Sequence, residues 1–159
     1  EVRPISGTNA NEAVFSRFVK PGDVVMVNST PGGGHISHHR MGSLGKFTRN
    51  IIDFPLTKDG YHIDVEKAAY LIEKARPKLI VVGKSLFLFP EPVQELAEVC
   101  RHTHTLLMYD GAHVLGLIAG GVGRKHLHST FLFLFLVAYL AVIGGLVPPD
   151  GGDLLGVER

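Results

Sequence analysis

Two runs of consecutive apolar residues place the strongest constraint on how this chain can fold. Leu79–Val82 reads LIVV and Leu106–Tyr109 reads LLMY, and neither run alternates apolar with polar residues. Short uninterrupted runs of this kind are typical of parallel strands that are covered by helices on both faces. Because segments with helical spacing alternate with these runs, the sequence predicts an α/β domain with a mostly parallel sheet.

The other expected elements continue this alternation, and their limits come from capping and turn residues. Pro21 and Gly22 end the first helix, Pro55 ends the second strand, and Asp64 caps the second helix. We expect, in chain order, helix Asn9–Val19, strand Asp23–Asn28, loop Ser29–Gly45, strand Asn50–Phe54, helix Val65–Ala75 and a helix from Pro92 to about Arg101.

Charge and cysteine content exclude several classes of protein. The 159 residues include 16 Lys and Arg against 15 Asp and Glu, a net charge of +1, so no basic excess indicates nucleic-acid binding. The single cysteine, Cys100, excludes an internal disulfide framework and a Cys-rich zinc site, and we expect it in the core rather than as a nucleophile. No signal-peptide pattern opens the chain, and we expect a cytoplasmic protein.

Ligands of open α/β sheets bind at the carboxyl ends of the strands. Three segments follow expected strands: the loop 29–39, Gly83–Ser85 and Asp110–His113. A fourth candidate, Ser6–Thr8, precedes the first helix, where backbone amides and the helix dipole suit a phosphate. The same three residues also fit an ordinary helix N-cap with a turn glycine, and both interpretations stay open.

The glycine- and histidine-rich loop has two interpretations as well. Its GGGH segment, residues 32–35, would let the backbone approach a ligand closely and present an imidazole, or it would be a flexible surface loop. His35, His38 and His39 have the spacing of metal ligands, but Pro and Gly disfavour a helix here, and we predict no metal site.

Asp110 is the most informative single residue, because it follows a strand expected to be buried. An ionised carboxylate in such a place is costly unless it is paired. Its partner could be the protonated ring nitrogen of a cofactor, as with the pyridinium of pyridoxal phosphate, or simply the amides of the following loop.

Several segments together resemble the glycine/serine hydroxymethyltransferase family, pyridoxal-phosphate enzymes of the aspartate-aminotransferase fold type I. The resemblance runs from about Val2 to Gly121, with Gly111 standing where the family usually has Met. The segments that carry it, in the family's order, are VRPISGTNANEAVF, GGGHISH, GKFTRN, GYHIDVEKA, RPKLIVVGKS and MYDGAHVLGLIAGG.

The resemblance implies a role for each matching residue. Gly7 and Thr8 would hold the cofactor phosphate, Ser85 would bond the phenolic oxygen, and Asp110 would pair with the pyridinium nitrogen. His35 would stack on the ring and His113 would sit beside its reactive end, and these two are the expected catalytic residues. His38 aligns with a second histidine of the family's loop.

The implied reaction converts serine and tetrahydrofolate to glycine and methylene-tetrahydrofolate. The implied partners are a small amino acid, the folate co-substrate and a second subunit of a homodimer or larger assembly. Two alternatives stay open. One is another fold-type-I enzyme, such as an aldolase or transaldolase acting on β-hydroxy amino acids. The other is a truncated chain without catalysis.

The end of the chain departs from the family. The cofactor-bearing lysine would lie some thirty residues after Asp110, but Ser129–Thr130 is followed by Phe131, and no residue here matches it. We therefore divide the chain into a partial cofactor-binding domain, 1–121, and a non-matching tail, 122–159. The uncharged segment Phe131–Val147 is expected to be helical: a membrane helix, a buried helix, or a tail unrelated to the family.

Overall fold

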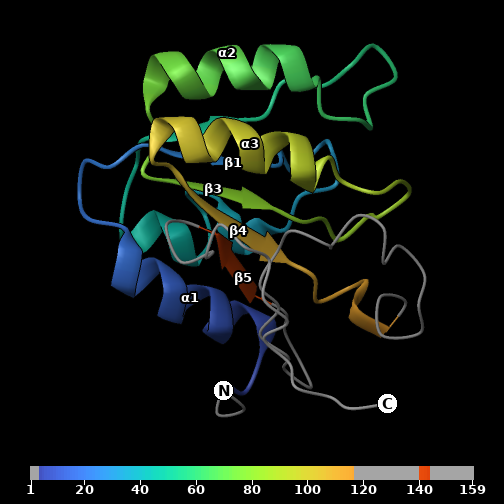
Figure 1. Ribbon diagram of the computed structural model, residues 1–159. Helices are drawn as coiled ribbons and strands as arrows, with labels where there is room; N and C mark the ends of the chain where they lie inside the picture. The colour runs from blue at the N-terminus through green and yellow to red at the C-terminus, as the bar shows by residue number, and fades with distance from the viewer. Residues whose placement is uncertain (1–3, 117–139, 144–159) are drawn as a thin grey trace, which may run out of the picture.

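The computed structural model describes residues 4–116 and 140–143, which form a sheet with helices on both faces (Figure 1). Its strand order is β2-β1-β3-β4-β5. The strands are β1 (Val25–Val27), β2 (Ile51–Asp53), β3 (Leu79–Val82), β4 (Leu106–Asp110) and β5 (Leu140–Ile143). The helices are α1 (Gly7–Phe18), α2 (Val65–Ala75) and α3 (Val93–Thr103), with two 3-10 turns, η1 (Ile36–His38) and η2 (Ser43–Lys46).

The first four strands are parallel, which confirms the α/β fold expected from the sequence. Strand β3 lies between β1 and β4, and its first residue, Leu79, is in register with Val25 on one side and Leu106 on the other. A parallel arrangement brings the carboxyl ends of these strands to the same edge of the sheet. The loops that follow β1, β3 and β4 therefore converge there.

Each face of β3 belongs to a separate hydrophobic core. Ile80 and Val82 are fully buried in the core that also contains Ile72 of α2 and Leu96 of α3. The adjacent residues Leu79 and Val81 are buried in the core that contains Phe15 of α1. Figure 1 shows the same layering, with α2 and α3 together above the sheet and α1 below it. This two-sided burial is why the LIVV run has no polar residue.

The tail differs from the sequence-based expectation in the part that the structure describes. Residues 140–143 form β5, a strand antiparallel to β4, whereas the apolar composition had suggested a helix across Phe131–Val147. The outer edge of β4 offers unpaired backbone N–H and C=O groups, and β5 pairs with them. The remainder of 131–147 and the boundary at 121 lie outside the described residues. Within the described part of the chain, no helix is long and apolar enough to cross a membrane.

Candidate functional site

A cavity of about 290 Å³ opens at the carboxyl-terminal edge of the sheet, near the lower end of the usual size range of ligand pockets. Four parts of the chain that are distant in sequence contribute to its wall. They are the start of α1 (Ser6, Gly7, Thr8, Asn11), the loop after β1 (His35, His38), the residue Lys84 after β3, and the end of β4 with its loop (Asp110, Ala112, His113).

Five of the six residues to which the resemblance gives a role at the cofactor line this cavity: Gly7, Thr8, His35, Asp110 and His113. The sixth, Ser85, is not among the lining residues; its backbone N–H donates to the carbonyl of Gly33 at 2.7 Å.

Asn11 also lines the cavity and was not expected there from the sequence, whereas Lys84 lies in the segment Gly83–Ser85, which the sequence placed at the carboxyl ends of the strands without giving Lys84 a role. The signal for Asn11 is its place three and four residues before the buried Val14 and Phe15, which puts a polar side chain on the apolar face of the helix. For Lys84 the only signal is its position just after a buried strand.

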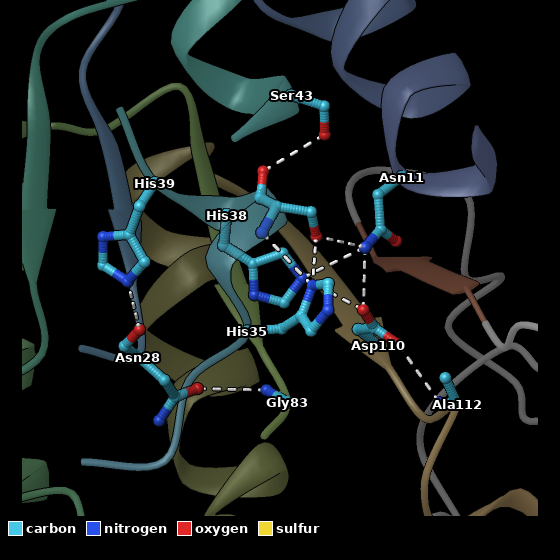
Figure 2. Close-up of polar contacts among 10 residues, drawn as sticks. Asn11, Asn28, His35, His38, His39, Ser43, Gly83, Asp110 and Ala112 are labelled. Carbon is cyan, nitrogen blue, oxygen red and sulfur yellow. Dashed lines mark hydrogen bonds and ion pairs between the residues drawn. The ribbon is translucent and has the colours of Figure 1, made fainter. Parts of the chain in front are cut away.

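The Asp110 carboxylate is the centre of a buried hydrogen-bond network (Figure 2). Its Oδ2 accepts from Asn11 Nδ2 at 2.8 Å and from His38 Nε2 at 3.0 Å. Its Oδ1 accepts from the backbone N–H of Ala112 at 3.1 Å. Both sequence-based interpretations of Asp110 thus remain compatible with the geometry, since a loop amide supplies one of three donors.

His38 is fully buried, and its Nε2 carries a proton that it donates to this network. Because Asp110 can only accept when ionised, Nε2 is the donor. In the described part of the chain no hydrogen-bond partner reaches His38 Nδ1, the nitrogen on the other side of the ring.

The same contacts decide the charge of Asp110. Burial by itself would raise the pKa of this carboxyl. The hydrogen bond and charge of His38, with the donors Asn11 and Ala112, outweigh burial and hold the pKa below its usual value of 3.8. Asp110 is therefore an anion at neutral pH, inside a cavity that it lines.

His35 presents a neutral imidazole to the cavity. Burial lowers the pKa of His35, and a charge on His38 lowers it further, against the opposing effect of Asp110. The backbone N–H of Ser37 donates to His35 Nδ1 at 3.2 Å, and the Ser37 hydroxyl lies 2.8 Å from the same atom. The proton of the neutral ring therefore sits on Nε2.

The glycine-rich loop before His35 is packed tightly against the end of β1. Gly34 is the closest contact, because a Cβ atom there would lie 2.1 Å from the carbonyl oxygen of Asn28. Gly33 has φ of +97°, a conformation that favours glycine. Residues 32–34 are buried, so the alternative of a surface loop is wrong for these glycines. The glycines let the backbone turn closely enough to place His35 at the cavity.

The start of α1 has both of the features that the sequence left as alternatives. Ser6 is the N-cap, since its side chain accepts from the N–H of Asn9 at 3.1 Å. Gly7 and Thr8 line the cavity at the same helix end, where the dipole favours an anion.

His39 lies apart from the other two histidines of the loop. Its Nε2 is 3.0 Å from the carbonyl oxygen of Asn28, and Figure 2 shows the ring on the opposite side of the loop from His35 and Asp110. Among residues 4–116, no group of three or more His, Cys, Asp or Glu side chains is arranged to hold a metal ion.

Comparison with known proteins gives a consistent result. The family model described as serine hydroxymethyltransferase matches residues 1–132. A protein of that name from Thermococcus kodakarensis is 51% identical over 120 residues, covering 76% of this chain and 28% of its own length. The proteins of that name from Pyrococcus abyssi and Staphylothermus marinus are 50% and 46% identical over 121 and 127 residues. The chain thus spans about 28% of the length of the curated relatives it matches.

Proposed function

This chain belongs to the serine hydroxymethyltransferase family, and we propose that its cavity is the pyridoxal 5′-phosphate site of such an enzyme. For the longer protein we propose the reversible conversion of serine and tetrahydrofolate to glycine and methylene-tetrahydrofolate. We propose that this chain alone does not catalyse it, because no residue after Ser129–Thr130 matches the family's cofactor-bearing lysine.

The observation that carries the proposal is the buried anion Asp110 in the cavity wall. A pyridinium N–H is a suitable partner for a carboxylate whose low pKa is maintained by His38 and Asn11. The charge balances the ring cation, and Ala112 holds the second oxygen so that the carboxylate keeps its orientation. The donor set of the cavity therefore fits this cofactor.

The remaining roles follow the family pattern at matching positions. Gly7 and Thr8, at the positive end of the α1 dipole, would hold the phosphate. His35, as a neutral ring that Ser37 orients, would stack on the pyridine. His113 would lie near the reactive end, and we keep Ser85 as the proposed partner of the phenolic oxygen.

When bound, the cofactor supplies an electron sink that stabilises negative charge at the α-carbon of the amino acid. The chain's own contribution is to keep that sink effective. Asp110 holds a proton at the ring nitrogen, and Asn11 and His38 keep Asp110 ionised. We further propose a soluble enzyme that assembles as a homodimer or larger oligomer in the cytoplasm, with a small amino acid and a folate as its substrates.

The test is binding by the full chain, measured by calorimetry. The ligand is pyridoxine 5′-phosphate, which has an alcohol in place of the reactive aldehyde, so that covalent reaction does not contribute. We expect saturable binding, and we expect Asp110→Asn to weaken it by about tenfold or more, the effect of losing one charged hydrogen bond.

The control is Glu12→Gln. Glu12 pairs with Lys46 at 2.8 Å on the exposed surface, away from the cavity, so this change removes one carboxylate without touching the proposed site. Equal affinity of the wild type and Asp110→Asn, or the absence of saturable binding, would refute the assignment.

A further inference from the structure

Lys84 lines the cavity, but its ammonium group is bound by residues outside it. Its side chain is 6% exposed, and Nζ lies 2.8 Å from Oε1 of Glu91, whose side chain is 2% exposed. Nζ also donates to the backbone carbonyl of Tyr61 at 2.5 Å. Neither Glu91 nor Tyr61 is among the residues that line the cavity. The two acceptors therefore hold the end of the lysine away from the cavity.

The backbone of Lys84 is fixed independently of its side chain. It forms an isolated antiparallel bridge with Gly34, and the neighbouring N–H of Ser85 donates to the carbonyl of Gly33. The N–H of Gly83 donates to the side chain of Asn28 at 3.0 Å. Because the main chain is held on both sides, the pair with Glu91 sets only the direction of the lysine side chain.

The charge of Glu91 depends on its pairing with Lys84. Burial raises the pKa of Glu91, while the hydrogen bond and charge of Lys84 and the nearby Asn28 and His62 oppose that rise. The Lys84 ammonium lies 2.8 Å from this carboxylate, so the two charges are buried as a pair.

A lysine in the wall of an aldehyde-binding cavity could react with the bound aldehyde. An unprotonated amine attacks the aldehyde carbon, a carbon–nitrogen double bond forms, and the aldehyde oxygen leaves as water. A protonated amine has no free electron pair and does not react. Confinement in one cavity raises the effective concentration of such an amine by orders of magnitude.

We propose that Lys84 is a latent second amine of the cavity, and that its ion pair with Glu91 prevents it from reacting with an aldehyde bound there. This inference rests on the proposed function for the presence of that aldehyde. In this proposal Glu91 keeps Lys84 from reacting, so that the aldehyde stays available to the amine that the reaction uses.

The experiment is reductive labelling of the full chain. Pyridoxal 5′-phosphate is added, borohydride then reduces any carbon–nitrogen double bond, and quantitative mass spectrometry measures the labelled fraction of each lysine. Lys46 and Lys67, whose side chains are 62% and 70% exposed, serve as internal references. We expect Lys84 in the wild type to be labelled at a tenth of their level or less.

Glu91→Gln is expected to raise labelling of Lys84 by about tenfold or more, the effect of losing one charged contact that holds Nζ outside the cavity, and to leave Lys67 unchanged. The matched control is Glu12→Gln, which releases Lys46 from an exposed pair and should leave Lys84 unlabelled. If Glu91→Gln does not give a folded protein by circular dichroism, Glu91→Asp replaces it. That variant withdraws the carboxylate by one methylene and should raise labelling by a smaller factor.

Excess pyridoxine 5′-phosphate should block the new labelling of Lys84, because it occupies the cavity and cannot react. Wild-type labelling of Lys84 at the level of Lys67 would overturn the inference. So would a folded Glu91 variant that binds pyridoxine 5′-phosphate and gives no increase, or an increase that this ligand does not block. Failure of the wild type to bind pyridoxine 5′-phosphate would instead refute the proposed function on which the inference depends.

Discussion

Replacing Asn11 by alanine tests whether the network around Asp110 is built as described. The Asn11 side chain is 1% exposed, and its Nδ2 donates to Asp110 Oδ2 at 2.8 Å and to Ser37 Oγ at 3.1 Å. The substitution removes both donors and leaves one carboxylate oxygen with His38 as its remaining partner.

The magnitude follows from these two contacts. A hydrogen bond to a charged group contributes about 1.5–3 kcal/mol and one between neutral groups about 0.5–1.5 kcal/mol. Alanine has a better helix propensity than asparagine, and this offsets about 0.7 kcal/mol of the loss. We therefore expect Asn11→Ala to lower the free energy of unfolding at pH 7 by about 1.3–3.8 kcal/mol.

The pH dependence gives a second, independent signature. The pKa of Asp110 is lower in the folded protein than its usual value of 3.8, so its ionised form contributes stability above that pH. This contribution is lost as the pH falls below 3.8 toward the folded pKa. Asn11→Ala removes one cause of the lowered pKa. The difference in stability between wild type and variant should therefore shrink as the pH falls through this range.

Urea unfolding followed by circular dichroism, repeated from pH 7 to pH 3, measures both effects. The matched control is Asn9→Ala, the same substitution at an exposed position of the same helix, which should cost little or nothing. A loss below about 1 kcal/mol at pH 7, or a loss that does not change with pH, would contradict the described network.

Three further predictions concern the elements that position the site. Gly34→Ala should lower the free energy of unfolding by about 1–3 kcal/mol or more in thermal unfolding, because the added Cβ would lie 2.1 Å from the backbone oxygen of Asn28. The control, Gly116→Ala, has open space around it and should be tolerated. Ser6→Ala should cost about 1 kcal/mol by loss of the α1 N-cap, whereas Ser16→Ala, exposed within the same helix, should not; equal effects in urea unfolding would refute the cap assignment. Burial raises the pKa of Cys100 to about 12, so iodoacetamide should leave this thiol unmodified at pH 8 in the folded protein and alkylate it in urea, as mass spectrometry would show.

Local patterns in the sequence were sufficient to predict most of the fold. The LIVV run predicted β3 at its observed residues, and Asp64 and the helical spacing after it predicted α2 from Val65 to Ala75. These features are local, because a continuous apolar run requires burial on both faces and a capping side chain acts within one turn. The tail lacked such local limits, and an apolar composition did not distinguish a helix from the strand β5.

The sequence by itself determined which loops meet, since parallel strands bring their carboxyl ends to one edge, and this was enough to indicate Asp110 and His35 as candidate site residues. Only the tertiary structure decided what charge those residues carry and which neighbours they have. Asn11 and Asp110 are 99 residues apart in the chain, and their 2.8 Å contact exists only after the sheet and α1 have packed. The pairing of Lys84 with Glu91 likewise depends on where two segments outside regular structure come to lie. Ionisation and reactivity follow from burial and from partners distant in sequence, and no local pattern of residues specifies either.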